Sequence, residues 1–158
     1  MLDVLARHRV AYVVIGGFAI ELHDVAVPPA RDVDITPSGT PENLRRLAGA
    51  LTELGARFRV PDGPAEGVEV PGGITPEWLG SMVTLTLVTD GGPLDVSLFP
   101  DGTKGYADLV AGRVELHYQE RTVPVASLED VIRSKEAAGR EKDIRVLPAL
   151  RAHLRRLS

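Results

Sequence analysis

An apolar run near the start of the chain constrains the folds open to this sequence. Residues 10–15 are almost all β-branched or aromatic, which is typical of a strand buried on both faces of a sheet. Gly16 and Gly17 follow directly and end the run, and residues 18–23 then predict a short helix. The segment therefore predicts a buried strand that passes through a pair of glycines into a helix.

Two carboxylates lie two residues apart on the next predicted strand, at residues 31–36. Side chains at i and i+2 share one face of a strand, so Asp32 and Asp34 point together while Val33 and Ile35 point into the core. Like charges held side by side resist ionisation, and a divalent cation is the usual compensation. The alternative is an edge strand that exposes both carboxylates to water, which the apolar neighbours of the pair disfavour.

A predicted hairpin supplies a third carboxylate. Residues 83–89 and 94–99 alternate between apolar and polar side chains on either side of an Asp-Gly-Gly turn at residues 90–92, a pattern typical of a β-hairpin. Asp95 lies on the polar face of the second strand. Three carboxylates on the polar faces of neighbouring strands suit a hard cation such as magnesium, so Asp95 joins the preceding pair as a candidate metal ligand.

Hydrophobic periodicity, helix-capping residues and turn residues predict the remaining helices and strands. Helices are predicted at residues 2–8, 41–54, 105–110, 127–139 and from 141 onward, a short strand at 58–60, and a second hairpin at 114–118 and 122–125. Residues 61–80 are rich in proline and glycine and predict a loop, with Trp78 covering an edge of the core. Pro148 is expected to interrupt or kink the last helix.

Length and composition narrow the classes of protein. With 158 residues the chain is expected to form one domain, an α/β core at 1–126 followed by helices at 127–158. The absence of cysteine excludes disulfides, thiolate metal sites and a cysteine nucleophile, and fits a cytoplasmic location. The longest apolar run, residues 10–20, is too short to span a bilayer, so no membrane partner is expected.

Charge is distributed unevenly along the chain. The net charge is −4, yet residues 131–158 carry eight Lys or Arg against three Asp or Glu. This basic tail is either a solvated helical face or an arm that meets phosphates. The acidity of the remainder argues against broad, non-specific coating of nucleic acid.

Two further features point toward phosphate. Gly16 and Gly17 form either a tight turn or a close approach of the backbone to a ligand at a helix start. Lys135 falls on the apolar stripe of its predicted helix, three or four residues after Val131 and Ile132. A lysine facing inward needs a partner, which it finds by snorkelling past the core edge or by reaching phosphates in a cleft. The four histidines have no metal-ligand spacing, and no Walker-type loop is present.

Together these motifs resemble the nucleotidyltransferase superfamily, which has a polymerase-beta-like fold. The resemblance is carried by Ile-Gly-Gly-Phe-Ala at residues 15–19, Asp-Val-Asp-Ile at 32–35 and Leu-Asp-Val at 94–96. Segments 125–135 and 139–143 are similar to the small stand-alone bacterial branch that includes toxins of the AbiEii and MenT type. The resemblance implies an α/β (α+β) nucleotidyltransferase fold, a mixed β-sheet flanked by helices with a C-terminal helical segment.

The resemblance also implies a magnesium-dependent reaction. A nucleoside monophosphate would move from a nucleoside triphosphate, such as ATP, to an acceptor hydroxyl. Two magnesium ions, or manganese in their place, would sit on Asp32 and Asp34, with Asp95 sharing one of them and helping to take the proton of the acceptor. The backbone at Gly16 and Gly17 would hold the triphosphate.

Three further residues enter through the same resemblance. Lys135 would neutralise the triphosphate, and Asp143 is assigned to the nucleotide site as the residue that orients Lys135 or Lys142.

The sequence departs from the family pattern just before the two acids, where the superfamily often has an arginine and a threonine. Pro28 and Ala30 occupy those positions here, so the phosphate contacts made there in relatives are expected to be missing or supplied by Arg31.

The sequence leaves the acceptor open. The leading interpretation is RNA, such as a tRNA 3′ end, modified by a toxin whose partner is a cognate antitoxin protein. A second interpretation is transfer to a small molecule, as in aminoglycoside resistance, or to a protein. A third is a non-catalytic nucleotide-binding module, which the retention of three clustered carboxylates disfavours.

Arg31 is the only basic residue that the sequence places beside those carboxylates.

Overall fold

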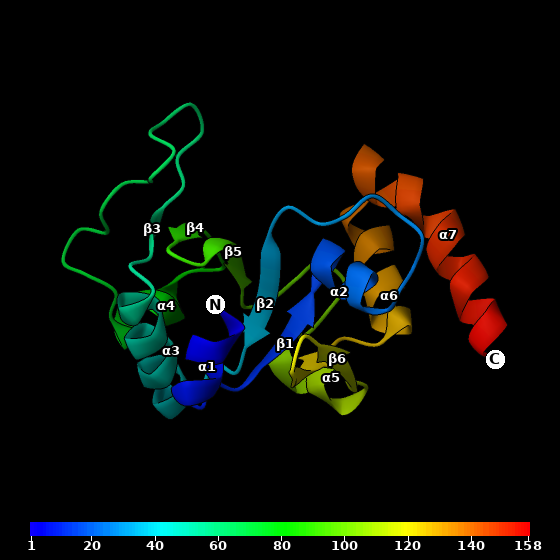
Figure 1. The fold of residues 1–158 in the computed structure, drawn as a ribbon, viewed down its shortest axis with the longest axis horizontal. Coiled ribbons are helices and arrows are strands. Elements are labelled where there is room, and N and C mark those ends of the chain that lie inside the picture. Colours follow the sequence, from blue (N-terminus) through cyan, green and yellow to red (C-terminus); the bar gives the residue numbers. More distant parts are fainter.

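A seven-stranded mixed sheet forms the centre of the computed structural model, which describes residues 1–158 (Figure 1). The strands are β1 (Tyr12–Ile15), β2 (Val33–Pro37), β3 (Arg57–Phe58), β4 (Thr84–Thr89), β5 (Gly92–Ser97), β6 (Val114–Tyr118) and β7 (Arg121–Val125). Their order across the sheet is β3-β4-β5-β2-β1-β7-β6. β2 pairs in parallel with β5, and β1 with β7, whereas the other neighbours are antiparallel. The predicted mixed sheet is confirmed.

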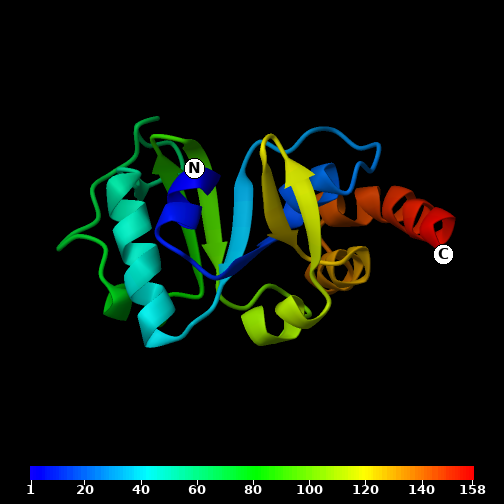
Figure 2. The same ribbon diagram turned by 60° about the horizontal axis from the view of Figure 1, so that its bottom comes forward.

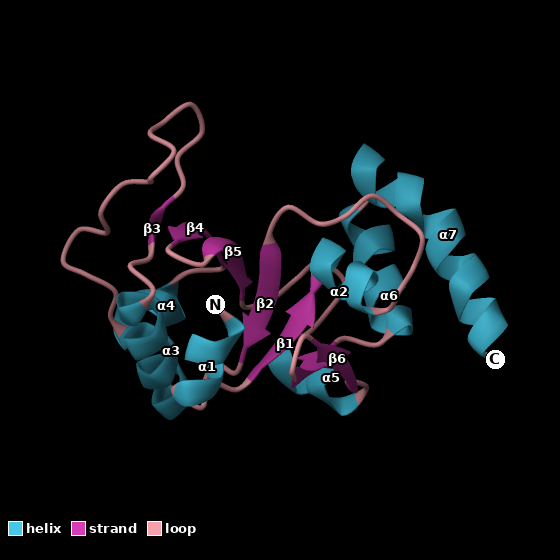
Figure 3. Cartoon of the chain, viewed as in Figure 1, coloured by secondary structure: helices cyan, strands magenta, loops and turns pink.

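Helices flank this sheet at both ends. They are α1 (Leu2–Arg7), α2 (Gly16–Leu22), α3 (Pro41–Glu53), α4 (Pro76–Ser81), α5 (Tyr106–Ala111), α6 (Leu128–Ala138) and α7 (Glu141–Leu157). Figures 1 and 3 show α1, α3 and α4 gathered beside the β3–β5 half of the sheet, and α2, α6 and α7 beyond β1. Figure 2 shows α7 projecting away from the strands toward the C-terminus. The predicted C-terminal helical segment is therefore present.

One hydrophobic core joins the strands to both groups of helices. It contains 30 buried residues, among them Val14 of β1, Leu47 of α3 and Leu150 of α7. In α3, Leu44, Leu47 and the other buried positions recur at helical spacing, so one face of the helix packs inward. The same cluster includes residues of both the expected α/β core and the C-terminal helices.

Side-chain caps begin two of these helices where the sequence predicts a helix start. The Thr40 hydroxyl accepts a hydrogen bond from the Asn43 amide at 3.3 Å at the start of α3. The Ser127 hydroxyl accepts one from the Asp130 amide at 3.1 Å at the start of α6. Each bond satisfies a donor that the first helical turn leaves without a partner. The start of α6 matters for the site, because this helix carries Lys135.

Part of the stretch at residues 61–80 is helical, so the prediction of a continuous loop is wrong. Residues Pro76–Ser81 form α4, and the hydroxyl of its N-cap, Thr75, accepts a hydrogen bond from the Trp78 amide at 3.1 Å. Pro76, at the start of α4, has no backbone N–H and therefore leaves no unsatisfied donor there. The Trp78 ring packs edge-to-face on Phe58 with centroids 5.4 Å apart, which confirms its predicted place over an edge of the core.

The last helix is continuous through its internal proline. α7 includes Pro148 without a break, so of the predicted interruption or kink the interruption is wrong. Leu147 and Leu150 are both buried in the core, and this packing holds the helical conformation although Pro148 lacks a backbone donor. None of the helices is both long and apolar enough to cross a membrane.

Candidate active site

Paired positions on neighbouring strands bring the predicted carboxylates together. β2 pairs with β5 so that Asp34 lies beside Asp95, and β5 pairs with β4 so that Asp95 lies beside Thr86. On the other side of Asp34 the paired residue is Ile15, at the end of β1. Adjacent strands lie about 4.8 Å apart and directly paired side chains share a face of the sheet. Asp34 and Asp95 are therefore direct neighbours.

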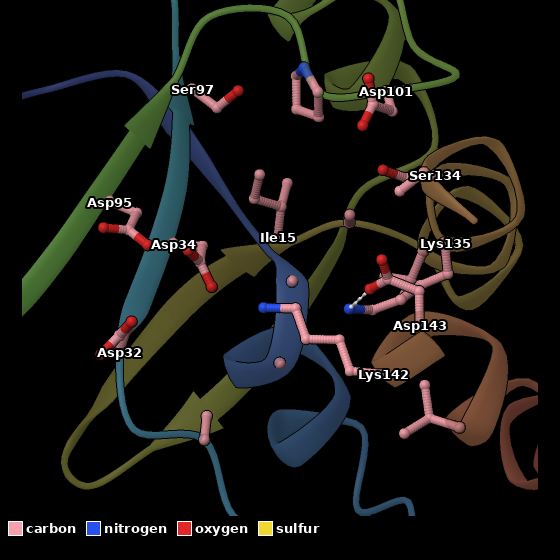
Figure 4. Close-up of a pocket in the computed structure, with 18 of the residues that line it drawn as sticks. Ile15, Asp32, Asp34, Asp95, Ser97, Asp101, Ser134, Lys135, Lys142 and Asp143 are labelled. Atoms are coloured by element: carbon pink, nitrogen blue, oxygen red, sulfur yellow. Dashed lines mark hydrogen bonds and ion pairs between the residues drawn. The ribbon is translucent and has the colours of Figure 1, made fainter. Parts of the chain in front are cut away.

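Asp32 directly precedes β2 and completes a group of three carboxylates, here called the acidic cluster (Asp32, Asp34 and Asp95). All three line one cavity (Figure 4). Ile35 is fully buried, and Val33 packs against the core from a half-buried position. β2 lies in the middle of the sheet, between β5 and β1, so the edge-strand alternative is wrong.

The glycine pair lies directly against the acidic cluster. Gly16 has a φ of +66°, in the left-handed region that favours glycine. A Cβ placed on Gly16 would lie 2.5 Å from Asp34 Oδ2, so any side chain there would collide with the carboxylate. Gly16 and Gly17 begin α2 and line the cavity. The pair therefore permits a close approach of backbone to carboxylate, in addition to turning the chain.

A cation that the sequence analysis missed bridges two members of the acidic cluster. Arg59 Nη1 and Nη2 each donate to one oxygen of Asp32 at 3.1 Å, and Nη2 also donates to Asp95 Oδ1 at 3.2 Å. Arg31, the basic neighbour that the sequence indicated, is exposed on the cavity wall instead. Arg59 directly follows β3, and only the pairing of β3 with β4 brings it near the acids. No local pattern encodes that pairing.

A second group of charges, here called the basic cluster (Lys135, Arg140, Lys142 and Asp143), lines the cavity from α6 and α7. Lys135 Nζ donates to Asp143 Oδ1 at 2.8 Å, and Arg140 Nε donates to Asp143 Oδ2 at 2.6 Å. Asp143 is fully buried, and 16% of the Lys135 side chain is exposed. Lys135 thus points inward, as its place on the apolar stripe predicted, and its partner is Asp143.

The cavity between the two clusters has a volume of about 950 Å³. Figure 4 shows Lys142 extending from α7 toward the acidic cluster, while Lys135 stays against Asp143. Lys142 is exposed on the cavity wall, and its positive charge opposes the rise in the pKa of Asp95. The sequence indicated Lys142 only as an alternative partner of Asp143. In the structure its ammonium group is placed to meet an anion in the cavity.

Ionisation differs sharply between the two clusters. Burial, followed by the charge of Asp95, raises the pKa of Asp34 to about 7. Burial likewise raises the pKa of Asp95, although the neighbouring guanidinium opposes it. At Asp143 burial acts in the same direction, but hydrogen bonds from Arg140 and Lys135 outweigh it, and the pKa is lowered. The acidic cluster is the one that lacks sufficient positive charge.

The donors of the acidic cluster suit a hard divalent cation. All its side-chain donors are carboxylate oxygens, the ligands that magnesium and manganese prefer. In their present positions no three side chains converge closely enough to hold an ion, and Asp32 and Asp95 bind Arg59 instead. A divalent cation would counter the repulsion that raises the pKa of Asp34. The residue types fit the ion, whereas their present hydrogen bonds favour the guanidinium.

Comparison with solved structures identifies the fold. The chain is similar to the lincosamide antibiotic adenylyltransferase LnuA in a lincomycin-bound crystal structure, with a TM-score of 0.62, 18% identity, and coverage of 96% of this chain and 92% of that one. It is also similar to ANT(2'')-Ia in complex with adenylyl-2''-tobramycin, with a TM-score of 0.60, 18% identity, and coverage of 97% and 84%. The fold is that of the nucleotidyltransferases, as the sequence motifs implied.

A third structure extends this similarity beyond the antibiotic-modifying enzymes. TM1012 from Thermotoga maritima matches with a TM-score of 0.54 and 20% identity over 92% of this chain and 84% of that one. Neither a family model nor a curated protein sequence matches the chain. At these identities the similarity establishes the fold, and the activity has to be argued from the site. The predicted AbiEii and MenT branch stays a prediction.

Proposed function

We propose that this protein transfers a nucleoside monophosphate from a nucleoside triphosphate to a hydroxyl group of a small molecule. The observation that carries the proposal is the single cavity with carboxylates on the strand side and cations on the helix side. Triphosphate carries several negative charges and suits the cations, whereas a reacting hydroxyl needs a nearby proton acceptor. The similar enzymes LnuA and ANT(2'')-Ia, with lincomycin and adenylyl-tobramycin bound, support a small acceptor.

The residues of the cavity divide the reaction between them. Lys135, held by Asp143, and the free ammonium of Lys142 neutralise the triphosphate. Gly16 and Gly17 let its phosphates approach the backbone beside the acidic cluster. Asp95 accepts the proton of the acceptor hydroxyl. The hydroxyl oxygen then bonds to the α-phosphorus, the bond from that phosphorus to its bridging oxygen breaks, and pyrophosphate leaves.

Magnesium, or manganese in its place, would be held by Asp32, Asp34 and Asp95. A bound ion in such a site polarises the phosphoryl oxygens and orients the attacking and leaving groups. The positioning of Asp34 does not depend on the ion, because the strand register and the absence of a side chain at Gly16 already place its carboxylate at the cavity wall. The protein therefore contributes mainly orientation and charge, as phosphoryl-transfer sites generally do.

RNA is the second candidate acceptor, and one observation favours it. The C-terminal part of α7 carries Arg151, Arg155 and Arg156, all exposed, on the helix that projects from the sheet (Figure 2). Such a surface suits the phosphates of a tRNA end. Arg151 is already paired with Glu136, which weakens this candidate. Action as a toxin with an antitoxin partner depends on RNA being the acceptor.

The decisive experiment supplies each α-labelled nucleoside triphosphate with magnesium and a panel of acceptors. The panel contains aminoglycosides, lincosamides and total tRNA, and products are identified by chromatography and mass spectrometry. We expect a labelled small-molecule product and pyrophosphate. Asp34→Asn should lower the rate on the order of a thousandfold, because the Asp34 carboxylate would hold the cation at the reacting phosphate.

A matched control separates loss of the site from general damage. Asp90→Asn removes a carboxylate that pairs with Arg57 and does not line the cavity, so its activity should equal that of the wild type. A labelled tRNA with no labelled small molecule would replace the small acceptor by RNA. No transfer to any acceptor, together with no magnesium-dependent binding of nucleotide, would contradict the enzyme assignment and favour a non-catalytic module.

A further inference from the structure

Arg59 bonds to two of the three carboxylates that would hold a divalent cation. Its guanidinium takes both oxygens of Asp32 at 3.1 Å and one oxygen of Asp95 at 3.2 Å. These are charge-assisted hydrogen bonds, and the contact with Asp32 is bidentate, the arrangement that arginine forms most strongly with carboxylates. The guanidinium and a divalent cation both carry positive charge, so they repel each other when both lie against the same carboxylates. Arg59 and the ion are therefore competitors.

The backbone at Arg59 is fixed, whereas its side chain has room to move. The Arg59 amide donates to Thr86 O at 3.0 Å, and Thr86 pairs with Asp95 across β4 and β5. The guanidinium thus reaches over Thr86 to the acids from the edge of the sheet. With 34% of its side chain exposed, Arg59 has a route into solvent through rotation about its own χ angles, without any change in the strand register.

We propose that Arg59 is a resident counter-ion of the acidic cluster, which competes with the divalent cation and leaves Asp32 and Asp95 when the ion binds. This inference rests on the proposed function, because it assumes that the acidic cluster binds the ion. An arginine stays charged at every ordinary pH, so it leaves by side-chain movement and not by loss of a proton. Arg59 therefore lowers the affinity for the ion while it stabilises the ion-free protein.

The test measures binding of manganese without nucleotide or acceptor, by the electron paramagnetic resonance signal of free Mn²⁺. Arg59→Gln keeps a hydrogen-bonding side chain and removes the charge, and we expect it to bind Mn²⁺ about tenfold more tightly than the wild type, the change expected from losing a competing charged hydrogen bond. Its melting temperature without metal should fall, and its gain on adding Mn²⁺ should exceed that of the wild type. Arg59→Lys, which keeps the charge but not the bidentate geometry, should give an intermediate affinity.

A variant in β3, two residues before Arg59, provides the control. Arg57 pairs with Asp90, so Arg57→Gln should leave the Mn²⁺ affinity unchanged. Equal affinities for the wild type and Arg59→Gln, with the same loss of melting temperature with and without Mn²⁺, would give Arg59 a purely structural role and overturn the inference alone. Weaker binding by Arg59→Gln would also overturn it. If neither protein binds Mn²⁺, the inference fails, whereas the proposed function is decided separately by the transfer and nucleotide-binding assays.

Discussion

Two carboxylates on opposite walls of the cavity are held in opposite ways. Asp143, on the helix wall, is fully buried and receives hydrogen bonds from Lys135 and Arg140, so its pKa is lowered. Asp34, on the strand wall, has Asp32 and Asp95 as neighbours, and its pKa is raised to about 7. Burial disfavours the charge at both positions. At Asp143 the neighbouring cations reverse the rise in pKa that burial causes, whereas at Asp34 the neighbouring carboxylates add to it.

The Asp143 carboxylate stabilises the fold, whereas the Asp34 carboxylate is one that a bound cation would stabilise. A buried carboxylate with two cations is satisfied within the protein, and removing it leaves those cations without a partner. A carboxylate surrounded by like charge gains most when a cation arrives from outside. Perturbed ionisation of the second kind, at the wall of a cavity, is typical of functional sites.

The first prediction, and the largest effect on stability, concerns Asp143. Asp143→Asn should lower the free energy of unfolding by about 3 kcal/mol, because Lys135 would remain largely buried without its partner carboxylate. Urea denaturation at neutral pH measures this. Glu141→Gln is the control, since its side chain is 89% exposed and pairs only with Arg145; it should change the value by less than about 0.5 kcal/mol. Equal stabilities of Asp143→Asn and the wild type would show that the Asp143 carboxylate does not stabilise the fold.

The second prediction concerns the pH dependence of stability without metal. The pKa of Asp34 is about 7 in the folded state and about 3.9 in an unfolded chain, so between these values the folded state binds more protons. The contribution of Asp34 to stability should therefore fall as pH rises from about 4 to about 7, with a slope of at most about 1.4 kcal/mol per pH unit.

Asp34→Asn should remove that slope, and urea denaturation across the same pH range compares the two proteins. Asp143 has the opposite sign, because its pKa is lowered: its contribution is present above the unfolded pKa and is lost as pH falls through the folded value. Parallel pH profiles for the wild type and Asp34→Asn would show that Asp34 is not the source of the slope.

The third and smallest effect concerns Lys142, the exposed cation between the two walls. Lys142→Gln should raise the KM for nucleoside triphosphate about fivefold, because an exposed ion contact contributes about 1 kcal/mol, and should change kcat much less. Steady-state kinetics over a range of triphosphate concentrations measures this. Arg155→Gln, near the end of α7 and outside the cavity, serves as the control. A fall in kcat at constant KM would move Lys142 from binding to the chemical step.

Much of the site is encoded by local pattern. Alternation along β2 and β5 places Asp32, Asp34 and Asp95 on polar faces, and the helical stripe of α6 turns Lys135 inward. These positions follow from periodicity within single elements, which the backbone geometry of strands and helices determines. The same holds for the cap at Ser127, where the hydroxyl and the amide it binds are three residues apart.

Features that depend on long-range pairing escaped prediction. Arg59 meets the acids only because β3 lies at the edge of the sheet, two strands from β5. Lys142 was recognised as a neighbour of Asp143 but not as a side chain that extends into the cavity.

The α4 helix is a local feature that the sequence prediction missed. Proline and glycine dominate its surroundings, although Thr75 and Pro76 together form a helix-start signal within that stretch.

The sequence alone determined the three carboxylates, the glycine pair and the inward lysine, because each is a matter of residue type and spacing within one element. Only the tertiary structure decided which charges compensate which. Strand order brought Arg59 onto Asp32 and Asp95, and the packing of α6 against α7 brought Lys135 onto Asp143. Electrostatic energy depends on distance in space, and distance along the chain does not determine it.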